Sequence, residues 1–320
     1  MVTVLHTIES LSAIPGPVHL AAGVFDGLHR GHQKVIAAAV DGARTSGGSS
    51  VVLTFDPHPA AVLRPEATPA MLVTPQRRAQ LIADLGVDAL LLLPFTKEVA
   101  KCRARAFVEA LSASCNPLNQ IAVGWDWTFG YEREGDAQLL GALGNELNFQ
   151  ATVIDPVCHR NGKIISSTAI RSAIKEGNVV LASKLLGHPH SADGTVAQGR
   201  QLGREIGFPT ANLPMEDVEI LLPPNGVYAV QARTTTNRQV LNGVANLGVR
   251  PTIDNEDSLL LEVHFFDFDG DLYGKEIRVE FISRIRGEQR FDGLDALKFQ
   301  IAEDTERARE MLLATESCNS

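Results

Sequence analysis

Hydrophobic positions in the first half of the chain alternate between two periods. Continuous apolar runs typical of buried strands occupy Val18–Gly23, Ser50–Phe55, Ala89–Leu93, Gln120–Gly124 and Ala151–Ile154. Between these runs, apolar residues recur at helical spacing in Gly31–Ala43, Pro75–Asp84, Ala104–Ser114 and Ala137–Leu147. This alternation predicts an α/β domain with a parallel sheet and helices on both of its faces. Ligands of such sheets bind at the carboxyl ends of the strands.

The pattern changes near residue 186, where Pro and Gly residues in Leu185–Gly194 predict a linker. Shorter strand signals follow at Gly194–Gln198, Val227–Arg233, Val240–Asn246, Leu259–Phe266 and Glu276–Ile282. Turn residues separate these runs, which indicates a small antiparallel β-barrel. Apolar residues at helical spacing in Asp295–Leu313 predict a C-terminal helix. We therefore expect two domains, residues 1–186 and residues 187–320.

Composition and charge narrow the class of protein. The chain has 320 residues, which is long for one hydrophobic core, and its longest apolar run, Ala89–Phe95, is far too short to span a membrane. Its net charge is −9 and neither half is basic, which argues against nucleic acid as a main partner. No signal peptide is evident, so we expect a cytoplasmic protein without a membrane partner, compatible with a homo-oligomer. The four cysteines lack metal-binding or redox spacing.

A glycine-rich segment lies between the first strand and the first helix. Gly23–His32 reads GVFDGLHRGH, and its glycines let the backbone turn tightly and approach a ligand closely. The helix that follows offers unpaired N–H groups and a positive dipole end to an anion. His29 and His32 stand three residues apart at this helix start, so both imidazoles can donate to one phosphate. The segment therefore predicts a phosphate-binding site.

Histidines at this spacing also have plainer interpretations. They can be surface residues on a glycine-rich turn, or zinc ligands, although no third ligand stands nearby. The choice depends on three further segments, which read TFDPHP at Thr54–Pro59, GWDWTFG at Gly124–Gly130 and SSTAIR at Ser166–Arg171. The first two follow strands, and the third opens a late helix, where its hydroxyl residues alone would be typical of an N-cap.

The HxGH pattern after a first strand resembles the nucleotidyltransferase superfamily, and the four segments together resemble its bacterial FAD synthetase branch. The resemblance implies a Rossmann-like domain that transfers an adenylyl group from ATP to FMN. It implies catalytic roles for His29, His32 and Asp126, and flavin contacts for Asp126 and His58. The residues that it implies for ATP are Gly23, Phe25, Gly31, Ser167, Thr168 and Arg171. Hydroxyls, a helix N-terminus and a guanidinium suit a triphosphate.

Some positions of the first domain leave the interpretation open. The family usually carries Phe and Arg within its GxDFxFG motif, where this chain has Trp127 and Thr128. Loss of that arginine removes a fixed charge near the site, so adenylyl transfer could be slower or differently tuned. His58 lies between two prolines, which is equally typical of a rigid turn.

A second glycine-rich loop opens the C-terminal domain. Gly194–Leu213 reads GTVAQGRQLGREIGFPTANL and lacks the GK[ST] ending of a Walker loop. Its PTAN segment resembles the riboflavin kinase signature, although a turn followed by a strand is the plainer interpretation. The resemblance implies that Thr210 and Asn212 hold Mg²⁺ and the ATP phosphates, a role for which hard oxygen donors are suited. Further ATP contacts that it implies are Gly194, Gly199, Gly203 and Arg204.

Later segments resemble the same kinase family in the same order, including GVYAV at 226–230, NLGVRPT at 246–252 and LEVH at 261–264. Glu262 interrupts an apolar strand, and alternation alone would place it on the solvent face. The resemblance implies that Glu262 is the general base for the ribityl 5′-hydroxyl. Arg286 is a candidate contact for the flavin or a phosphate, and an ion pair with Glu288 is an equal alternative.

The ordered motifs cover nearly the whole chain and predict a bifunctional transferase. We expect the C-terminal domain to make FMN from riboflavin and ATP, and the N-terminal domain to make FAD from FMN and ATP, with Mg²⁺ as cofactor. A monofunctional riboflavin kinase with an impaired first domain is the nearest alternative, because of Thr128. A non-catalytic flavin-binding module is the alternative from another class, and the intact polar residues of both loops speak against it.

Overall fold

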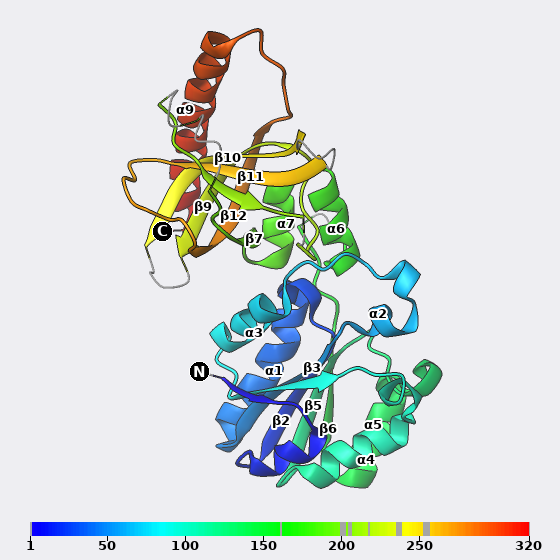
Figure 1. Ribbon diagram of the computed structural model, residues 1–320. Coiled ribbons are helices and arrows are strands. Elements are labelled where there is room, and N and C mark those ends of the chain that lie inside the picture. Colours follow the sequence, from blue (N-terminus) through cyan, green and yellow to red (C-terminus); the bar gives the residue numbers. More distant parts are fainter. Residues whose placement is uncertain are drawn as a thin grey trace. The chain divides into compact units, whose positions relative to one another are not determined.

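The computed structural model describes residues 2–160, 162–198, 203, 207–216, 218–234, 239–251 and 257–319. The chain divides into two compact units, Met1–Ser167 and Thr168–Ser320 (Figure 1). The Pro and Gly residues near position 186 led us to expect the division there. The difference consists of two helices, α6 (Ser167–Lys175) and α7 (Val179–Leu186), of which α7 contacts strands of the second unit.

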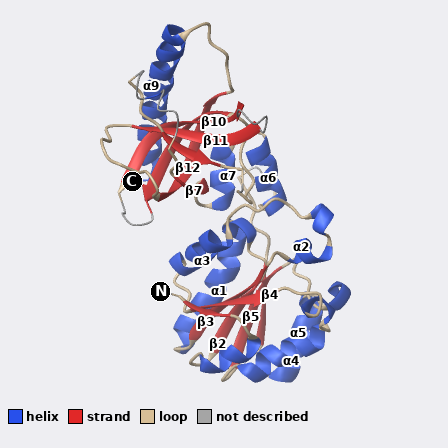
Figure 2. Cartoon of the chain, in the orientation of Figure 1, coloured by secondary structure: helices blue, strands red, loops and turns tan. Residues whose placement is uncertain are grey.

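The first unit is a parallel six-stranded sheet between two layers of helices, as the hydrophobic pattern predicts (Figure 2). Its strands are β1 (Thr3–Leu5), β2 (Val18–Ala22), β3 (Ser49–Asp56), β4 (Ala89–Pro94), β5 (Leu118–Gly124) and β6 (Gln150–Ile154), in the order β1-β4-β3-β2-β5-β6. Its α-helices are α1 (Arg30–Ser46), α2 (Pro59–Leu63), α3 (Pro75–Asp84), α4 (Ala104–Ser114) and α5 (Ala137–Leu147). Short 3-10 turns are η1 (Ile8–Ala13), η2 (Asp26–Leu28), η3 (Pro65–Ala67), η4 (Val99–Lys101) and η5 (Tyr131–Arg133).

Two hydrophobic cores lie on the two faces of this sheet. Successive strand residues point to opposite faces, so Val51 and Leu53 of β3 pack with α4 and α5, whereas Val52 packs with α1 and α3. Both faces are buried, which explains why these strands read as continuous apolar runs. The hydrophobic period revealed neither β1 nor the short helix α2. The three residues of β1 are too few to show a period.

The second unit is a curled antiparallel sheet with a long C-terminal helix. Its strands are β7 (His190–Thr195), β8 (Ala211–Pro214), β9 (Gly226–Thr234), β10 (Val240–Pro251), β11 (Asp257–Phe265) and β12 (Glu276–Arg286), in the order β7-β12-β9-β10-β11-β8. The edge strands approach each other where the Ala197 N–H donates to the Asn212 carbonyl at 2.8 Å. The inner face is filled by apolar side chains, among them Leu213, Leu261 and Val263.

The linker expected at Leu185–Gly194 is partly wrong, because β7 begins at His190. His190 and Ser191 are polar, so this stretch did not read as a strand, yet both side chains are buried. The His190 Nε2–H donates to the Leu221 carbonyl at 2.7 Å, which satisfies this nitrogen inside the unit. His190, with its backbone hydrogen-bond partner, thus occupies a buried strand position where the hydrophobic pattern of a strand would require an apolar residue.

Helix α9 (Leu294–Asn319) packs on the sheet through Ala308 and Leu312, which contact the outward-facing Val227 and Val244. A buried ion pair fixes the same helix. Arg286 of β12 donates from Nη2 to Asp304 Oδ2 at 2.7 Å and from Nε to both carboxylate oxygens at 3.0 Å. Bidentate pairs of this kind are among the stronger polar contacts.

We expect Asp304→Ala to lower the free energy of unfolding of the second unit by about 3 kcal/mol, because it leaves the largely buried Arg286 guanidinium without its partner. Urea unfolding followed by circular dichroism measures the change. Glu303→Ala, at the neighbouring exposed position, is the matched control. Equal stability of the two variants would contradict the importance of this pair.

Candidate functional site

The segment between β2 and α1 forms the first candidate site. His29 is the N-cap of α1 and is buried, and its Nδ1 accepts the backbone N–H of His32 at 3.3 Å. The rings of His29 and His32 stack with 3.5 Å between their centroids. Because Nδ1 of His29 is an acceptor, we assign the proton of the neutral ring to Nε2. The arrangement leaves Nε2–H as the donor that His29 can offer to a ligand.

Burial keeps both imidazoles uncharged. Desolvation lowers the pKa of His29 from 6.5 to about 4, and burial together with the neighbouring His29 lowers the pKa of His32 well below its ordinary value. The Phe25 ring meets His32 edge to face at 5.3 Å and completes the apolar side of the pair. At neutral pH these residues are therefore hydrogen-bond donors at a helix start and not fixed positive charges.

The backbone of this loop is strained. Phe25 and Leu28 have φ values of 52° and 43°, a region that bulky side chains avoid, and such residues cost about 1–3 kcal/mol each. Two glycines make the packing fit. A Cβ on Gly23 would lie 2.9 Å from the Phe25 ring, and one on Gly31 would lie 3.0 Å from Cε1 of His29. Strain held in place by close packing is typical of ligand-binding loops.

The late SSTAIR segment reaches this loop through Ser167. The Ser167 Oγ donates to the backbone carbonyl of Asp26 at 3.2 Å, across 141 residues of sequence. Asp26 is itself buried, and its Oδ1 accepts the N–H of Leu72 at 3.0 Å. Thr168 is exposed and Arg171 is half-buried on α6, in the second unit. Ser167, one of the three residues predicted for ATP in this segment, thus contacts the first loop.

The other predicted residues of the first unit lie at the ends of β3 and β5. The His58 Nδ1 accepts the N–H of Ala60 at 3.0 Å and thereby caps the short helix α2. This contact agrees with the rigid-turn interpretation, and a flavin contact of His58 stays a prediction. Asp126 is exposed after β5, and next to it the Trp127 ring stacks on Phe129 with 4.4 Å between centroids.

Strand register brings the PTAN and LEVH segments together in the second unit. Glu262 on β11 lies directly opposite Asn212 on β8, although 50 residues separate them in sequence. Side chains of directly paired residues point to the same face, with Cβ atoms about 4.5–5.5 Å apart. Thr210 precedes Asn212 by two positions, and the Asn212 Nδ2 donates to the backbone carbonyl of Thr210 at 3.3 Å. Glu262 is half-buried on the outer face of the curled sheet.

The loop before Thr210 is held by His264, which the sequence analysis did not single out. The His264 Nδ1–H donates to the Pro209 carbonyl at 2.9 Å, and its ring meets Phe208 edge to face. Gly203 closes the same turn, because its carbonyl accepts the Phe208 N–H and a Cβ would lie 2.4 Å from the Phe208 oxygen. His264 stands two residues after Glu262, within the LEVH segment. This position was the signal in the sequence that could have identified His264.

The remaining predicted residues of the second unit have different positions. Gly194 lies in β7 opposite Ile277. Gly199 and Arg204 lie outside the described residues. Arg286 binds Asp304 and not Glu288, the partner considered from the sequence, so its charge serves the α9 contact.

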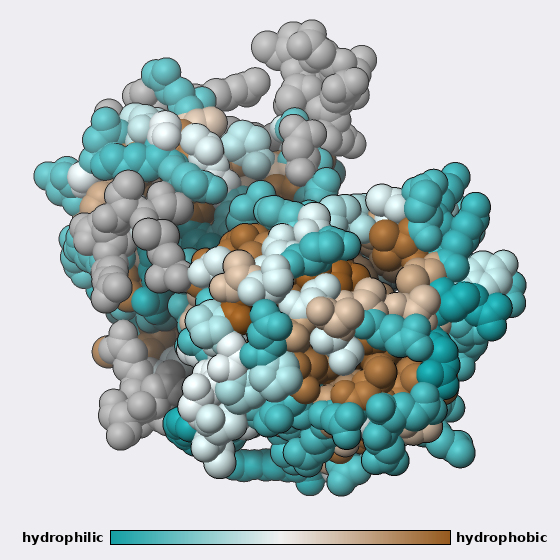
Figure 3. All heavy atoms as spheres, turned by 90° about the horizontal axis from the view of Figure 1, so that it is seen from below, coloured by the Kyte–Doolittle hydropathy of each residue, from teal (hydrophilic) through white to brown (hydrophobic). Residues whose placement is uncertain are grey.

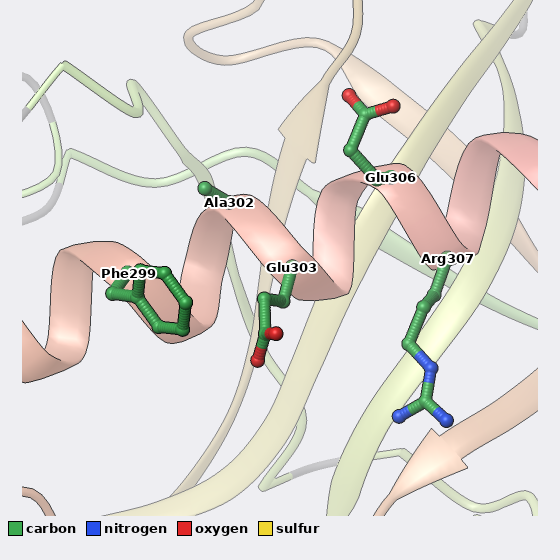
Figure 4. A pocket seen from close by; sticks show the side chains of 5 residues that line it. All are labelled: Phe299, Ala302, Glu303, Glu306 and Arg307. Atoms are coloured by element: carbon green, nitrogen blue, oxygen red, sulfur yellow. The ribbon is translucent and has the colours of Figure 1, made fainter.

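One further surface feature among the described residues lies on α9. Hydrophilic and hydrophobic residues are interspersed on the face shown in Figure 3. A shallow depression along α9 is lined by Phe299, Ala302, Glu303, Glu306 and Arg307, all from this one helix (Figure 4). No helix within the described residues is long and apolar enough to cross a membrane.

Acidification is expected to destabilise the first unit between about pH 6.5 and pH 4. The unfolded chain binds a proton at His29 near pH 6.5, whereas the folded site resists protonation until about pH 4. The unfolded state therefore holds more protons in this window, and the free energy of unfolding falls as the pH falls, by about 1–3 kcal/mol for this residue. Trp125 and Trp127 are the two tryptophans of the chain, so urea unfolding followed by their fluorescence reports on this unit.

The variant His29→Asn should show a shallower dependence of stability on pH, because asparagine does not titrate in this window. His6→Asn removes an exposed histidine of the same unit and serves as control. Identical slopes for wild type and His29→Asn would show that burial of His29 does not resist protonation.

Comparisons with known proteins follow the same division of the chain. A family model described as FAD synthetase matches residues 12–169, and one described as riboflavin kinase matches residues 186–312. The bifunctional riboflavin kinase/FMN adenylyltransferase of Escherichia coli K12 is 40% identical over 305 residues, which cover 95% of this chain and 96% of the relative. The protein of the same name from Bacillus subtilis strain 168 is 37% identical over 294 residues, 90% of each chain.

A solved structure is also similar over nearly the whole chain. The crystal structure described as a macrolide-efflux protein from Streptococcus pneumoniae is 34% identical, with a TM-score of 0.84. The match covers 97% of this chain and 99% of that one, so both units share its fold. The name of that protein concerns neither of the two activities that the family models describe.

Proposed function

Because the chain belongs to the family of bifunctional riboflavin kinase/FMN adenylyltransferases, we propose that its two candidate sites carry out the two successive steps. The chain phosphorylates riboflavin to FMN with ATP, and it adenylylates FMN to FAD with release of pyrophosphate. We assign adenylyl transfer to residues 1–186 and phosphorylation to residues 187–320.

Convergence of motif residues within each unit carries this proposal. The hydroxyl of Ser167 binds the carbonyl of Asp26 beside the paired histidines. In the second unit Asn212 lies directly opposite Glu262. Each of these contacts joins motif segments that are distant in sequence, and each falls within the region matched by one family model.

In the first site the reaction requires positioning more than proton transfer. A phosphate oxygen of FMN attacks the α-phosphorus of ATP, the bond from that phosphorus to the bridging oxygen breaks, and pyrophosphate leaves with the electron pair. FMN phosphate is already anionic, so no strong base is needed. His29 and His32, as neutral N–H donors at the start of α1, stabilise the charge that grows on the transferred group. A role of Thr168 and Arg171 toward the ATP phosphates stays a prediction from the family resemblance.

In the second site Glu262 acts as the general base. Its carboxylate accepts the proton of the ribityl 5′-hydroxyl while that oxygen attacks the γ-phosphorus of ATP, and ADP leaves. The register places Asn212 next to this carboxylate, so base and phosphate-binding residues share one face of the sheet. A general base in this position contributes about 10²–10⁴-fold to the rate.

The residues at the second site fit a magnesium ion. Thr210 and Asn212 supply a hydroxyl and an amide oxygen, which are hard donors. Within the described ranges no cluster of three His, Cys, Asp or Glu is arranged for a metal, so we propose that the nucleotide and water supply the other ligands. When bound, Mg²⁺ neutralises charge on the phosphates and on the leaving group. His264 would keep Thr210 in place through the carbonyl of Pro209.

Riboflavin, FMN and ATP are the substrates that fit the two activities. Our proposal includes no nucleic-acid or membrane partner, in keeping with the net charge of −9. It places the chain in the cytoplasm, where these substrates are available, and allows self-association.

Product analysis tests the function directly. Riboflavin, ATP and Mg²⁺ should yield FMN and ADP first, and then FAD and pyrophosphate, as resolved by chromatography with flavin fluorescence. FMN, ATP and Mg²⁺ without riboflavin should yield FAD alone. FMN without any FAD would indicate a monofunctional kinase, and tight flavin binding without either product would indicate a binding module.

A further inference from the structure

Arg78 is buried to 1% exposure, although arginine is among the residue types least often found inside proteins. It lies on α3 on the same face as Leu81 and Ile82, which belong to the core between helix and sheet. An arginine in such a place is unfavourable unless its donors are satisfied and its charge is balanced. Its partners therefore indicate its role.

The guanidinium of Arg78 joins two loops. Nη1 donates to the carbonyl of Val24 at 3.3 Å, and Nη2 donates to the carbonyl of Phe55 at 2.9 Å. The Asp56 carboxylate lies 3.8 Å from Nη2 and balances the charge. Val24 follows β2 and Phe55 lies at the end of β3, so both carbonyls stand at the carboxyl ends of neighbouring parallel strands.

The first of these loops carries the strained backbone and leads to His29 and His32 at the start of α1. Residues keep strained backbone angles only where their surroundings hold them. The Val24 carbonyl, immediately before the strained Phe25, accepts from Arg78 and also from the Thr54 Oγ at 2.8 Å. Two buried side chains thus fix the entry to the segment that leads to His29.

We propose that Arg78 is a positioning residue for adenylyl transfer. It holds the ends of β2 and β3 so that the loop from Val24 to His29 keeps the His29 imidazole directed at the transferred phosphate. The inference rests on the proposed function of the first site, but it concerns a residue that acts through the loop and not on the substrate. Lysine is a poor substitute, because a single ammonium lacks the planar fork that reaches two separate carbonyls.

Kinetics of FAD formation from FMN and ATP test this role. We expect kcat to fall about 10-fold in Arg78→Lys and about 100-fold in Arg78→Met, because a displacement near 1 Å at a reacting centre has effects of this size. KM for ATP and for FMN should change much less than kcat. Formation of FMN from riboflavin by the same protein should be unchanged. Arg44→Met, which removes an arginine exposed on α1, is the matched control.

A second readout separates positioning from a merely structural role. Nitrogen NMR of the histidine side chains should show His29 of the wild type as the Nε2–H tautomer, with its signal assigned by its loss in His29→Asn. In Arg78→Lys we expect this signal to move toward a mixture of tautomers, because the loop relaxes. A folded Arg78→Lys protein with wild-type kcat, or with lowered kcat and an unchanged His29 signal, overturns the proposal.

Thr54→Val keeps the proposal testable if both Arg78 variants fail to fold. It removes the other donor to the Val24 carbonyl while it preserves shape and leaves the arginine in place. We expect kcat for FAD formation to fall about 3-fold to 10-fold, as for loss of one hydrogen bond. A wild-type rate in this folded variant overturns the proposal. Absence of FAD formation by the wild-type chain would instead count against the function proposed for the first site.

Discussion

Replacement of His29 by asparagine is expected to lower kcat for FAD formation from FMN by about 10²-fold to 10³-fold, the effect of removing one preorganised donor from a site of developing charge. Asparagine can still accept the His32 N–H that the Nδ1 of His29 accepts, so it preserves the cap of α1. What it removes is Nε2–H. Formation of FMN from riboflavin by the same protein should keep its wild-type rate, because Glu262 and Asn212 belong to the other unit.

Two further variants define the cause of this loss. His29→Ala removes both the cap and the donor, so it should lose adenylyl transfer to the same extent and about 1 kcal/mol of stability in addition. His6→Asn, at an exposed position, should change neither activity. If His29→Asn restored the rate that His29→Ala loses, the residue would be only a helix cap.

The second large effect is expected at Glu262. Glu262→Gln keeps the size of the side chain and its hydrogen bonding but cannot accept the proton of the 5′-hydroxyl. We expect kcat for riboflavin phosphorylation to fall by about 10²-fold to 10⁴-fold. FAD formation from added FMN should continue at the wild-type rate. Coupled measurement of ADP release from riboflavin and of pyrophosphate release from FMN separates the two steps in one preparation.

Controls for Glu262 lie on the same sheet. Glu276→Gln, at the exposed start of β12, should leave both rates unchanged. Asn212→Ala should lower phosphorylation while it spares adenylyl transfer, because Asn212 is directly paired with Glu262. A Glu262→Gln protein that phosphorylates riboflavin normally would assign the base to another group.

Helix bounds were the part of the fold most accessible from sequence. Helix α3 begins at Pro75 because Thr74 caps it, its side chain accepting the Arg77 N–H at 3.1 Å, and α5 begins after the capping side chain of Asp136. These capping signals are local in sequence, so the hydrophobic period and the capping residues predict the same first residue for each of these helices. The strands of the second unit were harder, because β8 is only four residues long and β7 contains buried polar residues.

The sequence was enough to predict which residues form the candidate sites, but not how those residues are arranged in space. The motifs predicted that His29 and Glu262 are functional, whereas the low pKa of His29 follows from burial that no local pattern contains. Arg78 stood on the apolar face of a predicted helix, a visible anomaly, yet its partners Val24 and Phe55 come from distant strands. For Arg286 the sequence left a ligand contact and an ion pair with Glu288 as alternatives, because Asp304 approaches it only once α9 has folded onto the sheet.

The curled sheet presents Glu262 and Asn212 on its outer face, while apolar residues such as Leu261 and Val263 fill the interior. Core residues and proposed catalytic residues thus occupy alternate positions of the same strands. If the proposed roles of Glu262 and Asn212 hold, substitutions at inward-facing positions should change thermal tolerance more than activity, whereas substitutions at Glu262 and Asn212 should do the reverse.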